Sequence, residues 1–252
     1  MATDYRIDEA DGVLTFTLTR EAKANAVSWE MFAAMRDAAE ELDERKYLRV
    51  LVYAAEGKFF TSGLDLSSPA LQAADGDFRR FYRGFHAWLD YLEMIEKPVI
   101  MAVQGRCLGL GIELGASCDF RLASDAATFE LPEIANLALI PGSGGISRLT
   151  RIVGPHWTKY LVMAGKRISA EKAEQIGYVH EVCAASSFVD LVHDFAVALT
   201  KVPAEALGIA KLGIDHAVTA DRRASRDFDR MAQSYLIKLD DFAEKMSGFA
   251  GR

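Results

Sequence analysis

The sequence predicts an α/β fold, and two patterns in the order of its segments lead to that prediction. Short apolar stretches typical of strands recur between stretches with helical periodicity over most of the chain. From about Phe188 onward only amphipathic helical patterns remain, interrupted at Pro203 and near Thr219. Half of the 252 residues are hydrophobic, so a core of ordinary size is available. We therefore expect an α/β body in residues 1–200 and a helical segment in residues 201–252.

The N-terminal part of the chain is predicted to hold a hairpin, a helix and a buried strand. Tyr5–Asp8 and Val13–Leu18 flank the turn sequence EADG, and apolar residues alternate with threonines in the second segment. Ser28 is the expected N-cap of a helix that has apolar residues on one face. Arg49–Ala54 is short and apolar, as expected of a buried strand, and the segment GKFFTSGLDL after it is expected to be a loop.

The later α/β segments follow the same alternation. Phe78–Met94 has aromatic residues at helical spacing, which is typical of a core-facing helix, and Val99–Val103 is the next expected strand. Further strands are expected at Asp119–Ala123, Thr128–Leu131 and Tyr178–Val182. Further helices are expected at Ser143–Ile152, Trp157–Ala164 and Ala170–Ile176.

The charge and composition argue against several classes of protein. A formal net charge of −7 argues against nucleic-acid binding and against binding to anionic membranes, which need clustered positive charge. No apolar stretch approaches the roughly 18–20 residues that span a bilayer, and the N-terminal sequence MATDYRIDEADG lacks the pattern of a signal peptide. The three cysteines have no CxxC spacing and the five histidines have no ligand spacing. We expect a cytoplasmic protein without a metal site.

The segment GRCLGLGIELGA (105–116) contains Gly109, Gly111 and Gly115 in a pattern similar to a dinucleotide-binding loop. In that fingerprint the first glycine follows the strand almost at once and begins a long crossover helix. Here Gly109 lies six positions after the preceding strand, and the helix available before Asp119 is only about two turns long. This context argues against a nucleotide site.

A helix that begins near Leu110 offers a different function for this segment. Its first backbone N–H groups lack helical partners and lie at the positive end of the helix dipole, where they can stabilise a developing oxyanion. Gly109 and Gly111 would let a carbonyl group approach the backbone, and Glu113 in the first turn would face the same ligand. Alternatively, the glycines serve tight packing and Glu113 only favours the helix N-terminus. This segment alone does not decide between the two interpretations.

Two further segments favour a catalytic site. Leu64 follows the glycine of KFFTSGLDL, and its N–H is a candidate for the second donor of an oxyanion pair. Glu133, in FELPEIANLALIPGSGG (129–145), follows a proline and precedes a glycine-rich turn. Glu113 and Glu133 are twenty residues apart with one strand between them, so both can reach one cleft.

Five stretches, in this order, resemble the enoyl-CoA hydratase/isomerase (crotonase) superfamily over essentially the whole chain. They are REAKANAVS (20–28), KFFTSGLDL (58–66), KPVIMAVQGRCLGLGIELGASCDFRLAS (97–124), FELPEI…IPGSGGISRL (129–149) and GKRISAEKAEQIGYVHEV (165–182).

The resemblance implies a ββα-spiral core in residues 1–200, which holds the acyl-CoA site. It implies that residues 201–252 cover the active site and support homotrimers or hexamers. The substrate would be an acyl-CoA thioester, with no metal ion or redox cofactor. The thioester oxygen would accept hydrogen bonds from the N–H groups of Leu64 and Leu110, and the catalytic carboxylates would be Glu113 and Glu133. CoA and the acyl pocket would be contacted by Lys23, Ala24, Ser62, Asp65, Leu66, Gly109, Pro132, Pro141 and Gly142.

The chain departs from the family pattern at three places. Leu110 stands where most relatives have the middle glycine of GGG; the N–H remains, but the side chain is expected to crowd or redirect the acyl pocket. The segment between Glu133 and Pro141 is one residue longer than the usual hydratase form. The tail ends GFAGR and lacks the usual lysine-bearing extension, so one common contact to CoA is expected to be missing.

Because both glutamates are present, we expect reversible syn addition of water to a trans-2-enoyl-CoA, which gives a 3-hydroxyacyl-CoA. Glu113 would accept a proton from the attacking water, and Glu133 would deliver a proton to the α-carbon. A Δ3,Δ2- or dienoyl-CoA isomerase that uses the same oxyanion hole is the alternative. A non-catalytic acyl-CoA-binding or RNA-associated member of the fold is less favoured, because the charge is acidic and both glutamates are intact. Catalysis by a Ser–His nucleophile is the least favoured hypothesis.

Overall fold

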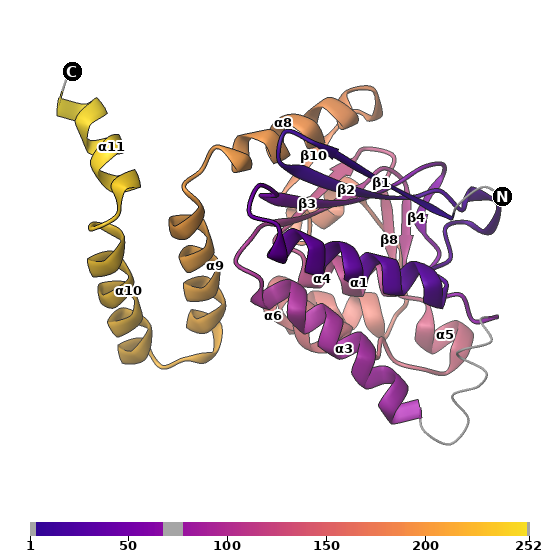
Figure 1. The fold of residues 1–252 in the computed structure, drawn as a ribbon. Coiled ribbons are helices and arrows are strands. Elements are labelled where there is room, and N and C mark those ends of the chain that lie inside the picture. The colour runs from indigo at the N-terminus through magenta and orange to yellow at the C-terminus, as the bar shows by residue number, and fades with distance from the viewer. Residues whose placement is uncertain (1–3, 68–77, 251–252) are drawn as a thin grey trace.

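The computed structural model describes residues 4–67 and 78–250. Two sheets and the helices packed on them form the body, and helices α9 (Ala204–Thr219), α10 (Arg222–Leu236) and α11 (Asp240–Ala250) extend to one side of it (Figure 1). The fold class predicted from the sequence, an α/β body followed by helices, is confirmed.

Within the described residues, six strands form the larger sheet in the order β1-β2-β3-β5-β7-β10. They are β1 (Tyr5–Ala10), β2 (Val13–Leu18), β3 (Val50–Ala55), β5 (Val99–Val103), β7 (Phe120–Ser124) and β10 (Glu181–Cys183). The hairpin β1–β2 is antiparallel and every later pair is parallel. Alternate residues of this sheet therefore face two different layers of helices.

The smaller sheet has the order β4-β6-β8-β9 within the described residues. Its strands are β4 (Phe59–Thr61), β6 (Arg106–Leu108), β8 (Thr128–Glu130) and β9 (Ile168–Ser169). The loop predicted for GKFFTSGLDL is therefore wrong at its start, because Phe59–Thr61 pairs in parallel with β6. Strands of two or three residues are too short to show an alternating pattern, so β4, β6 and β9 left no signal in the sequence.

The helices of the body are α1 (Trp29–Glu44), α3 (Phe78–Met94), α4 (Leu110–Ser117), α5 (Glu133–Leu137), α6 (Gly145–Val162), α7 (Ala170–Gln175) and α8 (Phe188–Thr200), with short 3₁₀ turns at Glu21–Lys23 and Ala185–Ser187. Of these, α1 and α8 lie on opposite faces of the larger sheet (Figure 1).

The two helices predicted between residues 143 and 164 correspond to the two parts of α6, which are separated at Gly154, whose φ of +73° and ψ of 166° are not helical. Two details differ from the sequence-based expectation. The last strand begins at Glu181 rather than Tyr178, because Tyr178 is buried and its hydroxyl donates to Ile112 O at 2.9 Å. The five-residue helix α5 was not expected, since it is too short to show helical periodicity.

The main core lies between the larger sheet and helices α1, α3 and α4. Ser28 is the N-cap of α1, as predicted, and its hydroxyl accepts from Met31 N at 3.3 Å. Phe85 and Trp88 of α3 are buried against Phe32 of α1, which agrees with the core-facing stripe predicted for α3. The side chains of α3 before Tyr82, apart from Arg79, lie outside the described part, as do the final two residues of the tail.

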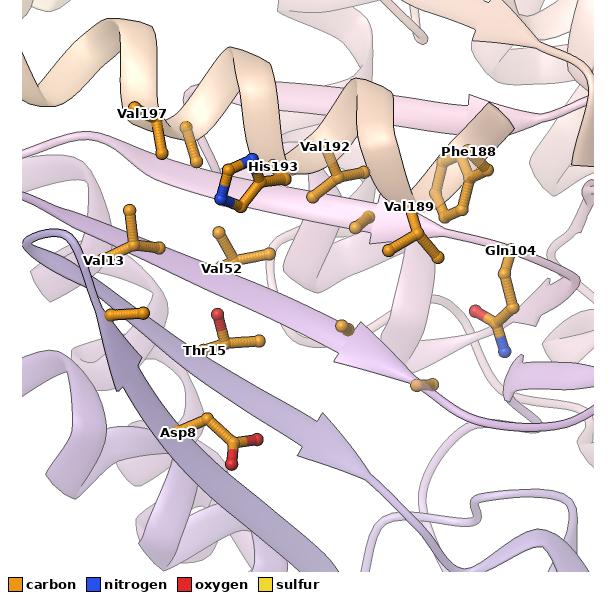
Figure 2. A pocket seen from close by; sticks show the side chains of 15 residues that line it. Asp8, Val13, Thr15, Val52, Gln104, Phe188, Val189, Val192, His193 and Val197 are labelled. Atoms are coloured by element: carbon orange, nitrogen blue, oxygen red, sulfur yellow. The ribbon is translucent and has the colours of Figure 1, made fainter. Parts of the chain in front are cut away.

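Helix α8 covers the opposite face of the larger sheet. Val13 and Thr15 of β2 and Val52 of β3 point toward this helix, whereas the residues between them point toward α1 (Figure 2). A largely apolar cavity of about 380 Å³ lies between α8 and the strands, with Asp8, Gln104 and His193 among its lining residues. None of the site residues predicted from the sequence lines it.

The C-terminal helices expose much apolar surface. Lys211 of α9 donates to Leu92 O at 2.7 Å and forms an ion pair with Asp119 at 2.9 Å, which attaches α9 to the body. Helix α10 has no buried residue, and Met231 on it is 69% exposed. Among the residues that the structure describes, no helix has the length and apolar character needed to cross a membrane.

The packing of α4 gives a prediction on stability. A Cβ on Gly115 would lie 2.4 Å from the Tyr178 hydroxyl and 2.7 Å from Met101 Sδ, so Gly115→Ala should lower the free energy of unfolding by about 1–3 kcal/mol. Gly84→Ala in α3 is the matched control, since a Cβ there meets no atom within 4 Å. It should raise the free energy of unfolding by about 0.5–1 kcal/mol. Urea unfolding measures both, and equal effects would contradict the packing argument.

Candidate active site

Three adjacent parallel strands of the smaller sheet end at one edge, and a chemically distinctive segment follows each. The segment with Leu64 follows β4, the segment with Leu110 and Glu113 follows β6, and the segment with Glu133 follows β8. Because the carboxyl ends of adjacent parallel strands lie side by side, segments far apart in the sequence converge there. The topology thus brings together the residues that the sequence marked as catalytic.

Helix α4 begins at the glycine turn after β6. Gly109 has φ +55° and ψ −119°, a conformation that favours glycine, and its N–H donates to Glu130 O at 3.1 Å. Its carbonyl oxygen accepts from Ile112 N and Glu113 N at 2.9 and 3.3 Å. The N–H of Leu110 has no hydrogen-bond partner among the described residues, as expected at a helix N-terminus.

The other two glycines of GRCLGLGIELGA serve packing. A Cβ on Gly111 would lie 2.5 Å from Thr61 Cγ2 and 2.7 Å from Cys107 Sγ, and Gly115 is equally crowded. The packing interpretation of this segment therefore holds for Gly111 and Gly115. Gly109 supplies the conformation that exposes one N–H, and the other two let α4 lie close to its neighbours.

The second turn follows β4 and contacts the first. Gly63 O accepts from Val27 N at 2.9 Å, and Asp65 N donates to Val27 O at 2.9 Å. Both bonds join the neighbours of Leu64 to Val27. Because successive backbone groups of an extended segment point in opposite directions, the N–H of Leu64 points away from Val27, and it has no partner among the described residues. A Cβ on Gly63 would lie 3.8 Å from Leu110 N. The two turns therefore lie close together, and each has one N–H group without a partner among the described residues.

Glu113 is buried beside this pair. Its side chain is on the first turn of α4, the residue is 4% exposed, and Oε1 accepts from Ser143 N at 2.7 Å and from Gly145 N at 3.3 Å. Burial, followed by the charge of Glu133, raises the pKa of Glu113 to about 7 although the two N–H groups favour the ionised form. A carboxyl group with this pKa exchanges protons readily at neutral pH.

Glu133 approaches the same turn from α5. Pro132 is the N-cap of α5, and Glu133 is its first residue. Oε1 of Glu133 lies 2.9 Å from the position that a Cβ on Gly109 would take, and Oε2 is buried with no hydrogen-bond partner in the described structure. Burial raises the pKa of Glu133. A buried carboxylate oxygen without a partner is costly, which marks Glu133 as a candidate functional residue.

The predicted CoA-contacting residues lie on the far side of the Leu64 turn. Ser62 N donates to Ala24 O at 2.9 Å, so segment 20–27 runs beside segment 61–67. Lys23 and Leu66 are exposed there. Asp65 differs, because its carboxylate is already hydrogen-bonded within the protein, to groups described below.

The predicted acyl-pocket residues lie on the segment after α5. Pro141 is buried against Gly145, whose Cβ position is 2.8 Å from Pro141 Cβ. Gly142 faces the ring of Tyr82 in α3, since its Cβ position is 2.8 Å from Tyr82 Cε1. Burial and then the charges of Glu113 and Glu133 raise the pKa of Tyr82, which places this phenol near both carboxylates. Sequence reasoning did not single out Tyr82; the aromatic stripe of its helix was the only signal.

Arg148 is a second residue that sequence reasoning missed. It is buried in α6, donates to Ser143 O at 3.1 Å and forms ion pairs with Glu93 at 2.8 Å and Asp90 at 2.5 Å. Arg148 thereby holds the turn whose N–H groups bind Glu113. Its two acidic partners lie more than fifty residues away, so no local pattern in the sequence indicates these ion pairs.

No group of three or more His, Cys, Asp or Glu side chains suited to a metal ion occurs in the described part of the chain. The groups gathered at the site are two N–H donors, two carboxyl groups and one phenol. This set can hold a carbonyl oxygen and move protons beside it.

Comparison with known proteins agrees with this geometry. The family model for enoyl-CoA hydratase/isomerase matches residues 8–252. The chain belongs to the enoyl-CoA hydratase/isomerase family. Its members act on acyl-CoA substrates, and the chain has the crotonase fold.

Individual members of the family are similar over nearly the full length. A carnitinyl-CoA dehydratase of Salmonella enteritidis is 36% identical over 240 residues, which cover 94% of this chain and 89% of the relative. Among solved structures, an enoyl-CoA hydratase subunit of Geobacillus kaustophilus is 32% identical with a TM-score of 0.91, covering 99% of this chain and 95% of that one. An enoyl-CoA hydratase of Bacillus anthracis is 28% identical with a TM-score of 0.90, covering 99% and 96%.

The raised pKa of Glu113 predicts that the fold loses stability as the pH rises. The folded state holds the proton of Glu113 more tightly than the unfolded state does. The stabilisation from the protonated carboxyl group is therefore fully present below about pH 4.5 and is lost as the pH rises through about 7. Glu113→Gln removes the buried charge, so at pH 8 it should be more stable than the wild type by up to about 3 kcal/mol. At pH 4 the two should be equal. Chemical denaturation at both pH values measures this, and a pH-independent difference would contradict it.

Proposed function

We propose that this member of the family is an enoyl-CoA hydratase, which adds water reversibly and syn to a trans-2-enoyl-CoA and gives a 3-hydroxyacyl-CoA. One observation carries the proposal. Glu113 is buried and Glu133 is half-buried, both have a raised pKa, and both lie near the turn at Gly109, after which the N–H of Leu110 has no partner among the described residues.

The backbone donors act on the thioester carbonyl. Attack of water on the β-carbon moves negative charge through the α-carbon onto the thioester oxygen. The N–H groups of Leu64 and Leu110 would bind that oxygen more strongly as its charge grows, which lowers the barrier rather than only tightening substrate binding. The donors belong to two packed turns, so they need little reorganisation when the charge develops.

The two carboxyl groups move the protons. Glu113, ionised, would accept a proton from water as the oxygen bonds to the β-carbon. Glu133 would give a proton to the α-carbon, and its unpartnered Oε2 is the atom with a free position for that proton. The proton that Glu113 gained then restores Glu133 through solvent exchange or a shared water molecule. The net reaction adds one water molecule and needs no redox cofactor or metal ion.

The rest of the substrate would lie along both turns. CoA would pass Lys23, Ala24, Ser62 and Leu66. The acyl chain would pass Gly109 and continue toward the residues on either side of α5. There Pro132, Pro141, Gly142 and the ring of Tyr82 would border it. The side chain of Leu110 is buried, so it packs into the protein beside the site instead of projecting into solvent.

A Δ3,Δ2- or dienoyl-CoA isomerase remains the alternative within the family. It would use the same donors but move a proton along the acyl chain without adding water. The presence of both glutamates favours hydration, because one acid–base group is enough for such a proton shift. The similarity to carnitinyl-CoA dehydratases, whose name describes loss of water from a CoA ester, favours hydro-lyase chemistry as well.

Loss of the enoyl absorbance of crotonyl-CoA tests the proposal. The wild type should hydrate crotonyl-CoA, and Glu133→Gln should lower kcat by about 10²–10⁴-fold while butyryl-CoA binding is retained. Glu130→Gln, on the strand before Glu133, is the control and should keep kcat. Turnover of a 3-enoyl-CoA without hydration of crotonyl-CoA would instead assign the isomerase. Binding of butyryl-CoA without either reaction would assign a non-catalytic member.

We also propose that residues 201–252 act in assembly of a homotrimer, or of a hexamer of two trimers, and in covering the site. The exposed apolar residues Met231, Tyr235, Phe242 and Met246 of α10 and α11 support this, since such surface is normally covered. Met231→Glu should reduce the sedimentation coefficient of the assembly. Gln233→Glu, an exposed position on another side of α10, is the control. A monomeric wild type would contradict the proposal.

A further inference from the structure

An ion pair between Arg20 and Asp65 stabilises the turn that carries Leu64. Arg20 Nη1 lies 2.7 Å from Asp65 Oδ2 and donates to Ala26 O at 3.0 Å. The other carboxylate oxygen of Asp65, Oδ1, accepts from the N–H of Ser67 at 3.0 Å and from its hydroxyl at 2.6 Å. The side chains of Arg20 and Asp65 are only 16% and 11% exposed.

These contacts stand directly beside the bridge that orients the donor. Val27 and Leu64 form a parallel bridge, and Ala26 and Asp65 are their immediate neighbours. One guanidinium nitrogen of Arg20 therefore joins both sides of the bridge. Rotation of the peptide group before Leu64 would break the bond from Val27 N to Gly63 O, which lies next to the place where Arg20 joins the two segments.

The opposite segment needs such a restraint, because its backbone is strained. Ala24 and Asn25 both have φ of +51°, in the left-handed region. The side chain of Asn25 donates to Glu56 O and Phe59 O at 2.9 and 2.8 Å, which fixes one end of the segment. The Arg20–Asp65 pair fixes the other end.

The charge and the hydrogen bonds of Asp65 agree with a structural function in this turn. Hydrogen bonds from Ser67 and then the Arg20 guanidinium lower the pKa of Asp65 to about 2, so the carboxylate is charged at every pH at which the protein would work. Both of its oxygens already have protein partners. A direct contact with CoA, as expected from the sequence, would compete with these bonds.

We propose that Arg20 and Asp65 are positioning residues that hold the N–H of Leu64 toward the thioester oxygen without touching the substrate. This inference rests on the proposed function, because it assumes that an acyl-CoA thioester binds between Leu64 and Leu110. It replaces the CoA contact expected for Asp65 by an action through the neighbouring peptide group.

Infrared spectroscopy of bound butyryl-CoA tests the inference without requiring turnover. A ¹³C label at the thioester carbon isolates the carbonyl stretch, which hydrogen bonding lowers. In the wild type, binding should lower this frequency. In Asp65→Asn and Arg20→Gln the lowering should be about half as large or less, because one of two donors is misdirected. The affinity for free CoA, which has no thioester carbonyl, should not change.

Kinetics give a second readout. Each variant should lower kcat for crotonyl-CoA at least about tenfold. This loss is expected to be smaller than the loss on complete removal of an oxyanion donor. The double variant should lose no more than either single variant, because each already breaks the same pair. Asp4→Asn is the matched control, since it breaks the other ion pair of Arg20, at 3.1 Å, and keeps the pair with Asp65. It should keep the wild-type frequency and kcat. Ser67→Ala, which keeps the ion pair, gives a milder variant if the others fail to fold.

The outcomes separate the two proposals. An unchanged frequency shift in folded Asp65→Asn would overturn the positioning function. Weakened binding of free CoA with the shift retained would make Asp65 a CoA ligand, as the sequence suggested, and would also overturn it. A wild type that lowers the carbonyl frequency but does not hydrate crotonyl-CoA would overturn the hydratase proposal alone. A wild type without any shift would overturn both.

Discussion

The close approach of two backbone turns, at Gly63 and Gly109, is the constraint on which the rest of the site depends. Each glycine has a positive φ, and a Cβ on Gly63 would reach to within 3.8 Å of Leu110 N. This contact brings close together two turns from distant parts of the chain, each with an N–H group that has no partner among the described residues. The parallel pairing of β4 with β6 makes the contact, because it ends both strands at one edge of the smaller sheet.

The electrostatics of the site follow from that geometry. Once Glu113 and Glu133 share the space around Gly109, each is removed from water, and the charge of Glu133 further disfavours ionisation of Glu113. The protein offsets part of this cost with the N–H groups of Ser143 and Gly145. The same burial that destabilises the ionised fold brings the pKa of Glu113 to about 7, where it suits acid–base catalysis.

On each side of the site, the side chain of an arginine donates hydrogen bonds that fix the backbone. Arg148 bonds Ser143 O and two acidic residues of α3, and so fixes the turn that binds Glu113. Arg20 plays the corresponding part for the turn of Leu64. In both cases a partly buried ion pair acts on peptide groups rather than on a ligand, and its value lies in a defined geometry more than in stability.

The sequence by itself determined the α/β class, the start of α4 at Leu110 and the two glutamates, because hydrophobic periodicity, glycine positions and family motifs are local signals. Tertiary structure alone decided β4, β6 and β9 of the smaller sheet, which are too short to carry a periodic signal and form only by pairing with their neighbours. It also decided the parts played by Tyr82, Arg148 and Asp65. These depend on partners far away in the chain, and a side chain's chemistry follows from what the fold places beside it.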